Sequence, residues 1–339
     1  MHASTEAQEE ALNMTKSFSS EVPFEQGLLD TGDGNRVYYE LRGNPHGTPV
    51  LIVHGGPGSG SPKGTPRSFD PERYLIILFD QRGCGRSRPH AADPSTPTEL
   101  NTTQHLLADM EQLRIHLKID QWLLFGGSWG SGLAIEYAER FPENVRGLVV
   151  ASVSTMSRSE VDWLYRGGVG QLFPQEWDRF VNGVPAEIRT DDLVADYARL
   201  MENPNAIVRE QAAIEWTSWE DAVLSLEPNG RSNVYSQRPT DALVAFVRIC
   251  SHYAANAAWR VEGALLQDAQ TLRQVPGTII HGRLDLSCPL KNAWELANSW
   301  PNANLVIVDD AGHKGSPTMN QAFHDAFEFV NHTENLGNS

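Results

Sequence analysis

Short, continuously apolar runs recur along the chain, separated by stretches with helical spacing. Residues 49–53 (PVLIV) form such a run, which is the pattern of a strand buried on both faces of a parallel sheet. Because helical stretches lie between the runs, the pattern predicts βαβ units and a mostly parallel sheet. Residues 36–41 alternate like an exposed strand. The other apolar runs are 74–79, 122–125, 147–150, 277–280 and 305–308, and the clearest helical stretches are 104–117 and 130–140.

The strand–helix rhythm stops between about residues 154 and 260. This stretch has helical spacing, little strand signal and five tryptophans, and the rhythm resumes after it. We therefore predict an α/β protein with an inserted helical cap at 154–260. The core is expected to comprise residues 27–153 and 261–331, preceded by a polar leader at 1–26. The tryptophans of the predicted cap are Trp163, Trp177, Trp216, Trp219 and Trp259.

Composition narrows the classes of function. The chain has 339 residues, of which 40% are hydrophobic and 21% charged, as is usual for a globular protein. Its 27 basic and 43 acidic residues give a net charge of −16, which argues against binding to nucleic acid or to an anionic membrane. No window approaches 18 uncharged apolar residues, so no membrane-spanning helix is expected.

Cysteine usage and the N-terminal segment predict a cytoplasmic location. Cys84, Cys250 and Cys288 have neither the spacing of a zinc site nor the density of a secreted disulfide scaffold. The first 20 residues contain no apolar stretch of the kind found in signal peptides. The oligomeric state is left open by these patterns.

The segment Gly126-Gly127-Ser128-Trp129-Gly130 fits the pattern G-x-S-x-G. It follows a predicted buried strand and opens a predicted helix, which is the context of a nucleophile on a sharp strand-to-helix turn. Small flanking residues are needed because the backbones crowd closely at such a turn. The pattern predicts Ser128 as a nucleophile, against the simpler alternative of a glycine-rich turn.

A nucleophilic serine needs a base, and the base needs an orienting acid. In this architecture the acid follows the serine in sequence and the histidine comes last. Asp285 lies just past the strand at 277–280, and His313 lies in a loop after the strand at 305–308. Asp309 and Asp310 could compete for the role of the acid, but they lie very near His313 in sequence.

Acyl transfer also needs hydrogen-bond donors for the developing oxyanion. The glycine loop at 54–58 (HGGPG) follows the first buried strand, so its backbone N–H groups can point into the site. The amide of Trp129 is the second expected donor. A phosphate-binding loop is the alternative, but neither a Walker pattern nor G-x-G-x-x-G is present here. We expect no cofactor, and the histidines show no metal-ligand spacing.

Several segments together resemble the proline iminopeptidases, which are α/β-hydrolase-fold serine aminopeptidases with a helical cap. The resemblance runs from about Gly27 to Val330, and it implies the same three catalytic residues together with Gly56 and Trp129 as oxyanion donors. The segments that carry it are HGGPG at 54–58, FDQRGCGRSRPH at 79–90, GGSWGS at 126–131, HGRLDLSCP at 281–289 and AGH at 311–313.

The predicted substrate site departs from the family pattern at one of two acidic positions. In the family, acidic cap residues bind the free amine of the substrate. Glu220 matches the first, in a segment resembling W-x-x-W-E, although it could also be an exposed helix charge. Cys250 stands where the family has a second glutamate in R-I-E-x-H-Y. Loss of one anion is expected to weaken selection for an ammonium group.

The predicted pocket for the prolyl ring is altered as well. Ala151, Ser154 and Leu164 stand where the family tends to have arginine, phenylalanine and tyrosine. The loss of two aromatic walls would enlarge or reshape a small apolar pocket, unless Trp163 or Tyr165 refills it. The residues expected to contact the substrate are Gly55, Ser154, Leu164, Glu220 and Cys250.

The sequence therefore favours a serine hydrolase that cleaves an amide bond through an acyl-enzyme. The favoured activity is release of an N-terminal residue, proline by family likeness, from a small peptide. An amidase or esterase for a small molecule without a free prolyl amine is the main alternative. A non-catalytic ligand-binding protein on the same fold is a more distant one, and a nucleophilic role for Cys250 lacks a separate base and acid.

Overall fold

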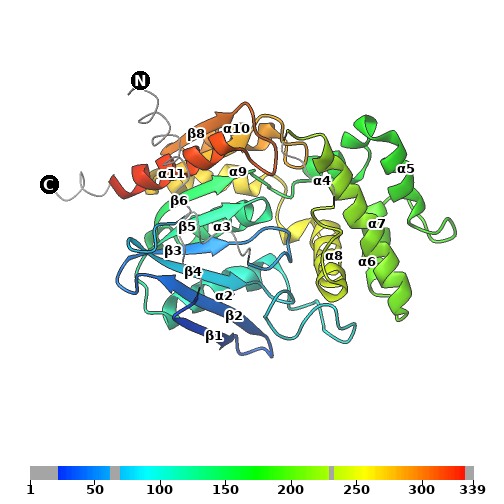
Figure 1. Cartoon of the computed structure of the whole chain (residues 1–339), viewed down its shortest axis with the longest axis horizontal. Helices are drawn as coiled ribbons and strands as arrows, with labels where there is room; N and C mark the ends of the chain where they lie inside the picture. The colour runs from blue at the N-terminus through cyan, green and yellow to red at the C-terminus, as the bar shows by residue number, and fades with distance from the viewer. Residues whose placement is uncertain (1–21, 62–68, 229–232, 333–339) are drawn as a thin grey trace, which may run out of the picture.

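The computed structural model describes residues 22–61, 69–228 and 233–332. In this part of the chain, eight strands form one sheet in the order β1-β2-β4-β3-β5-β6-β7-β8 (Figure 1). Strand β2 is antiparallel to β1 and β4, and every pairing from β4 to β8 is parallel. The strands are β1 (Glu25–Asp30), β2 (Arg36–Gly43), β3 (Thr48–Val53), β4 (Tyr74–Asp80), β5 (Trp122–Gly127), β6 (Val145–Ala151), β7 (Gly277–Gly282) and β8 (Ala303–Val308).

The six predicted apolar runs all lie in strands, and the mostly parallel sheet is confirmed. Two details at the N-terminal edge differ from the prediction. Strand β1 begins at Glu25, inside the segment predicted as a polar leader, and the rest of that segment up to residue 21 lies outside the described residues. Strand β2 is largely buried rather than exposed, because Val37, Tyr39 and Leu41 pack in the apolar core on one face of the sheet.

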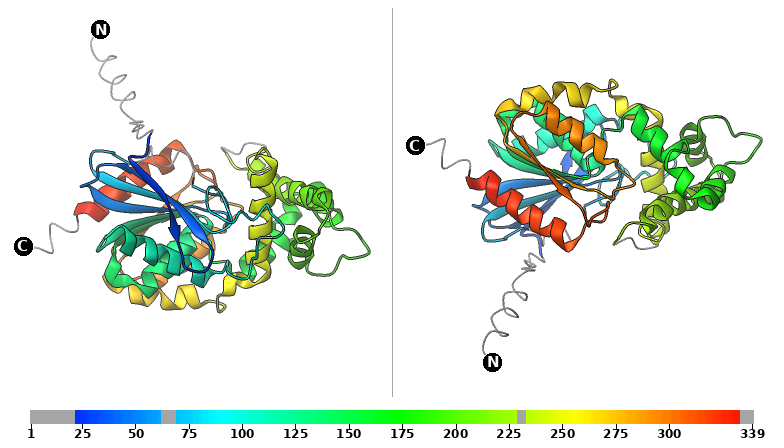
Figure 2. Two further views of the ribbon diagram at one scale, coloured as in Figure 1. Left: turned by 90° about the horizontal axis from the view of Figure 1, so that it is seen from below. Right: turned by 90° about the horizontal axis from the view of Figure 1, so that it is seen from above.

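Helices cover both faces of the sheet (Figure 2). Alternate residues of each strand point to opposite faces, so Leu51 and Val53 of β3 pack in one apolar cluster and Val50 and Ile52 pack in another. The first cluster contains side chains from α2 (Thr103–His116), α3 (Trp129–Arg140), α9 (Ala264–Asp268) and α10 (Leu290–Ser299). The second is closed by α11 (Pro317–His332), whose Phe327 is buried against the sheet.

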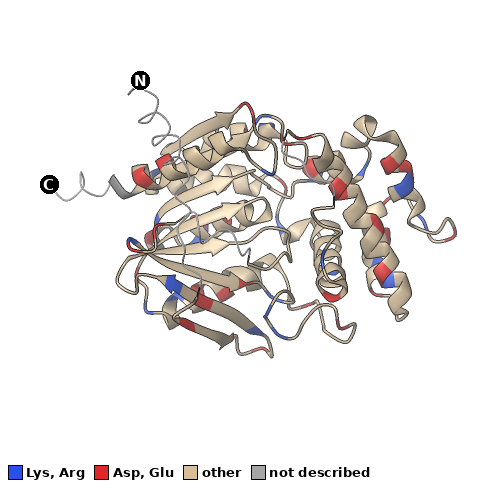
Figure 3. Cartoon of the chain, in the orientation of Figure 1, with Lys and Arg blue, Asp and Glu red and all other residues tan. Residues whose placement is uncertain are grey.

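Helices α4 to α8, which follow β6 in the chain, form a separate group at one end of the sheet (Figure 1). They have an apolar core of their own, in which Phe180 stacks on Tyr197 and Trp219. In the view of Figure 3, acidic residues occur both on these helices and on the sheet region, so acidity does not single out one part of the molecule. The helices are α4 (Arg158–Tyr165), α5 (Pro174–Asn182), α6 (Leu193–Met201), α7 (Ala206–Ser225) and α8 (Thr240–Ala255).

Candidate active site

Ser128 lies in a strained turn between β5 and α3. Its φ of 56° and ψ of −131° are unusual for a residue with a side chain, and such strain is common at functional sites. The turn requires glycine on both sides. A Cβ on Gly126 would lie 2.2 Å from the Gly130 carbonyl oxygen, and a Cβ on Gly130 would lie 2.1 Å from that of Val53. The local sequence therefore presents the Ser128 hydroxyl at the end of the sheet.

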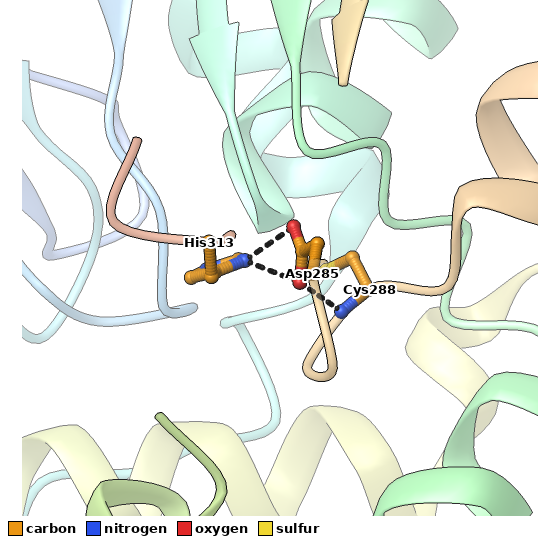
Figure 4. Close-up of side chains that lie close together, drawn as sticks. All are labelled: Asp285, Cys288 and His313. Atoms are coloured by element: carbon orange, nitrogen blue, oxygen red, sulfur yellow. Dashed lines mark hydrogen bonds and ion pairs between the residues drawn. The ribbon is translucent and has the colours of Figure 1, made fainter. Parts of the chain in front are cut away.

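Asp285 and His313 form a hydrogen-bonded pair from the loops after β7 and β8 (Figure 4). His313 Nδ1 lies 2.9 Å from Asp285 Oδ2 and 3.1 Å from Oδ1. Burial alone would lower the pKa of His313, but the Asp285 carboxylate outweighs it and raises the pKa above the usual 6.5. Burial would likewise raise the pKa of Asp285, and His313 holds it below the usual value instead. The pair has the orientation that a general base and its orienting acid need.

The backbone around Asp285 fixes the carboxylate in place. Oδ1 accepts hydrogen bonds from the N–H groups of Ser287 (3.0 Å) and Cys288 (2.8 Å). The two competing acids have other partners: Asp309 pairs with Arg283, and Asp310 accepts from the hydroxyls of Ser316 and Thr318. The structure thus pairs His313 with Asp285.

His281 supports this loop as a neutral imidazole. The Val153 N–H donates to His281 Nδ1 (3.1 Å), so the other ring nitrogen carries the proton and donates to the Cys288 carbonyl (2.8 Å). Burial lowers the pKa of His281, which favours this neutral form. His281 therefore acts as a core hydrogen-bonding residue.

Asp285, Cys288 and His313 also bring three metal-ligating atom types within 4.8 Å of one another. A metal would need the Cys288 thiolate, but burial raises the pKa of this thiol well above its usual value. The Asp285 carboxylate is already engaged by His313 and two backbone donors. The donor set therefore fits an acid–base pair beside a neutral thiol better than a metal centre.

The loop after β3 lies against the Ser128 turn. A Cβ on Gly55 would lie 3.3 Å from Ser128 Cβ, and Gly56 lines both hollows next to Ser128. Gln81 joins this loop to Trp129: its side-chain amide donates to the His54 carbonyl (2.8 Å) and accepts from the Trp129 indole (3.0 Å). The two predicted oxyanion donors, the amides of Gly56 and Trp129, are thus on backbone segments that Gln81 holds together.

Two hollows meet at Ser128. We call the first the inner cavity; it has a volume of about 60 Å³ and is lined mainly by residues between Ser154 and Ala254. We call the second the outer groove; it has a volume of about 480 Å³ and lies between the glycine loop and the segment after His313. The residues that line both are Gly56, Ser128, Tyr235 and His313. An acyl group and its leaving group bound at Ser128 therefore have separate spaces available.

Glu220 is a buried carboxylate in the wall of the inner cavity. Its Oε1 accepts hydrogen bonds from the Tyr165 hydroxyl (2.6 Å) and the Trp216 indole (2.7 Å). Burial raises the pKa of Glu220, although Tyr165 and Trp216 oppose the rise. A bound cation would offset that burial penalty.

Three further residues that were predicted to contact the substrate also line the inner cavity: Ser154, Leu164 and Cys250. The Cys250 thiol donates to the Pro57 carbonyl (3.1 Å), and burial raises its pKa well above the usual value. Tyr165 lines the same cavity, whereas the indole of Trp163 donates to the Leu286 carbonyl. Gly55 lines the outer groove.

Two buried carboxylates near the site were not identified from the sequence. Glu160 lines the inner cavity and accepts from the Ser154 hydroxyl (2.5 Å) and the Asn292 amide (2.9 Å). Glu227 accepts from the backbone N–H groups of Leu286 and Lys314, and thereby contacts both loops of the acid–base pair. The Ser157-x-x-Glu160 spacing signals a helix start, but no local pattern points to Glu227.

Comparison with known proteins shows clear relatives. A family model described as the alpha/beta hydrolase fold matches residues 48–317. A probable proline iminopeptidase of Streptomyces coelicolor is 44% identical over 304 residues, which cover 88% of this chain and 93% of that protein. The proline iminopeptidase of Arabidopsis thaliana is 41% identical over 295 residues, covering 87% of this chain and 76% of that protein.

Solved structures are similar in fold. A proline iminopeptidase-related protein from Thermus thermophilus gives a TM-score of 0.57 at 20% identity, covering 90% of this chain and 96% of that one. A putative lipase from Acinetobacter baumannii gives the same TM-score at 14% identity, with 97% of each chain covered. The predicted α/β-hydrolase fold is confirmed. Among the described residues, no helix combines the length and apolar character that crossing a bilayer requires.

Proposed function

The chain belongs to the proline iminopeptidase family of the α/β hydrolases, and we propose that it releases the N-terminal residue, proline foremost, from short peptides. It is a serine hydrolase of the aminopeptidase type. We propose specific catalytic residues and a class of substrate for it. The domain boundaries at 154 and 260 are part of the proposal: the separate apolar core of helices α4 to α8 supports a cap between two halves of the core.

In the proposed reaction, Ser128 Oγ attacks the carbonyl carbon of the first residue while His313 takes the hydroxyl proton. The amides of Gly56 and Trp129 stabilise the resulting oxyanion, and Asp285 stabilises the imidazolium. The C–N bond then breaks, and His313 gives its proton to the leaving amine. Water then attacks the acyl carbon while His313 takes a proton from it. His313 gives this proton to Ser128 Oγ as the ester bond breaks, which frees the first residue and restores Ser128.

The observation that carries the proposal is the position of Glu220. Both hydrogen bonds that Glu220 accepts from described residues fall on Oε1, within a cavity that Ser128 and His313 also line. Oε2 is therefore the oxygen offered to the amine of a substrate whose carbonyl lies at Ser128. The inner cavity of about 60 Å³ is too small for a long acyl chain.

A second candidate function rests on Cys250. This thiol is protonated and bonded to the Pro57 carbonyl, so it brings no negative charge to the cavity wall. With one acidic position lost, an amidase or esterase acting on a small molecule without a free amine is the alternative.

Substrate pairs that differ only at the amine separate the two candidates. Prolyl and alanyl arylamides would be compared with their N-acetylated forms and with ester analogues. We expect a higher kcat/KM for the free amines, and a fall of about 10- to 100-fold for them in Glu220→Gln, because a charged hydrogen bond is lost. A clear preference of the native enzyme for the blocked substrates would overturn the aminopeptidase and favour the alternative.

Glu215→Gln is the matched control for Glu220→Gln. Glu215 lies on the same helix, α7, but pairs with Arg179 outside the inner cavity. The control should keep the preference for the free amine. Equal losses in both variants would mean that the effect of Glu220→Gln comes from the cap as a whole.

We place the enzyme in the cytoplasm as part of the same proposal. Cys84, Cys250 and Cys288 are all free and buried, which fits a reducing compartment. Fractionation of the source cells with an antibody against the chain would test this location.

A further inference from the structure

Two cations line the outer groove next to the site: Arg238 and Lys314. Aromatic rings and a hydroxyl hold them. The Arg238 guanidinium lies 4.1 Å from the centre of the Phe246 ring and donates to the Ser59 hydroxyl (3.3 Å). Lys314 Nζ lies 4.7 Å from the centre of the Tyr235 ring, which stacks on Phe246. The two positive charges thus flank one aromatic pair.

Neither cation forms an ion pair with a carboxylate within the described ranges, although the chain has 43 acidic residues. The acids that raise the pKa of Lys314 are Glu227, Asp221 and Glu220, and all three accept hydrogen bonds from other groups; Glu220 accepts from Tyr165 and Trp216. Asp221 accepts from the backbone of Tyr235 and Ser236, and Glu227 accepts from the backbone of Leu286 and Lys314. Burial lowers the pKa of the Lys314 ammonium, so an anion beside it would be stabilising.

The cations and Glu220 lie in different hollows that meet at Ser128. Glu220 is in the inner cavity, whereas Arg238 and Lys314 line the outer groove. A substrate cleaved at Ser128 by the proposed reaction has its first residue in the inner cavity, so its leaving group lies in the outer groove. The site is therefore negative where the amine enters and positive where the leaving group lies.

We propose that Arg238 and Lys314 bind a carboxylate on the leaving group, so that the preferred substrates are dipeptides with a free C-terminus. In a dipeptide, the carboxylate belongs to the residue directly after the cleaved bond. The enzyme then recognises both charges of a zwitterion, the ammonium at Glu220 and the carboxylate at the two cations. This inference rests on the proposed aminopeptidase function and names its substrate class.

The test compares prolyl-alanine with prolyl-alanine amide, which differ only in the C-terminal charge. We expect kcat/KM to be about 10- to 100-fold higher for the free acid, because one or two charge-assisted hydrogen bonds are made only with it. In Arg238→Gln, Lys314→Gln and the double variant, the ratio of kcat/KM for acid over amide should fall toward one. Because the ratio is taken within each variant, a general loss of activity does not affect it.

Two surface cations supply matched controls for the substitutions. Arg283 pairs with Asp309, and Lys291 pairs with Glu295, and neither lines the outer groove. Arg283→Gln and Lys291→Gln should keep the native ratio, and a ratio that fell equally in these controls would overturn the assignment to Arg238 and Lys314. A native ratio near one, with both peptides cleaved, would overturn the carboxylate site and leave the aminopeptidase standing. Cleavage of neither peptide would overturn both proposals.

Discussion

The two regions that meet at Ser128 are built differently. Ser128, Asp285 and His313 come from loops at the ends of strands β5, β7 and β8, and backbone contacts fix them closely. Glu220 and Cys250 come from helices α7 and α8, which pack around an aromatic core of their own. With the proposed roles, reaction chemistry and substrate recognition rest on separate cores.

Under the proposed roles, this separation would allow the substrate side to change while the catalytic side stays intact. A Cβ at Gly126 or Gly130 would overlap backbone atoms, so the nucleophile turn tolerates little change. Cys250 and Leu164 instead contribute side chains to a cavity wall, where another side chain alters shape and charge but leaves the turn intact. Substitutions in the catalytic region, in the core of helices α4 to α8 and at the contact between them test this separation.

The largest effect is expected from Ser128→Ala. Removal of the nucleophile should lower arylamide hydrolysis by about 10⁴-fold or more and abolish covalent labelling by a fluorophosphonate, while the thermal unfolding midpoint stays close to native. Mass spectrometry of the labelled protein measures the modification. Ser159, exposed on α4, supplies the control: Ser159→Ala should be labelled like the native enzyme. Labelling that persists in Ser128→Ala would contradict the assignment of the nucleophile.

A substitution that opens a cavity in the apolar core of helices α4 to α8 should leave Ser128 in position. Phe180 is 1% exposed and contacts Tyr197, Trp216 and Trp219. Phe180→Ala should lower the free energy of unfolding by about 3–5 kcal/mol, measured by urea denaturation, while fluorophosphonate still labels Ser128 in the folded protein.

The control for this variant is an exposed position of the same region. Ile207 is 74% exposed on α7, so Ile207→Ala should change the free energy of unfolding by less than about 0.5 kcal/mol. If Phe180→Ala abolished labelling under conditions where the protein remains folded, the two regions would not be separable.

The smallest effect is expected from Glu227→Gln, which acts between the regions. Burial first, and then Asp285, raise the pKa of Glu227 to about 7. The charged groups that face it are Asp285, His313 and Lys314, with the Cys288 thiol nearby. Because the Glu227 carboxylate raises the pKa of His313, its removal should lower that pKa.

His313 must be neutral to act as a base, so the acidic limb of the pH profile of kcat/KM should move to lower pH in Glu227→Gln. A shift of about half a pH unit is expected from one nearby charge. Because Glu227 is itself protonated below about pH 7, the shift should be clearest where the native carboxylate is ionised. Glu215→Gln should leave the limb in place, and an unmoved limb in Glu227→Gln would contradict a charge effect on His313.

The sequence predicted those parts of the molecule whose structure is determined by residues close together in the chain. The apolar runs marked the strands because a buried parallel strand is apolar on both faces. Strand β1 was not predicted, because alternate side chains remain exposed and its order comes from pairing with β2. The turn at Ser128 was visible because the glycines that it requires, Gly126 and Gly130, lie within two residues of the serine in the chain.

Contacts between distant segments could not be predicted in the same way. Glu227 contacts loops 59 and 87 residues away, and Glu160 contacts Asn292, which is 132 residues away. Glutamate is ordinary at either position in a helical region, so no local pattern distinguishes a buried carboxylate from an exposed one. The position of Arg238 and Lys314 beside one groove is likewise a property of the folded chain.

The meeting of the two hollows at Ser128 also sets the order of events in a turnover. In the proposed reaction the leaving amino acid occupies the outer groove, so water can approach the acyl-enzyme from that side only after this product has left. By microscopic reversibility, a groove that holds a departing amino acid also holds an arriving one in the position for attack. At high concentrations of free amino acid the acyl-enzyme would then divide between hydrolysis and the formation of a new peptide bond, which makes the outer groove an acceptor site as well as an exit.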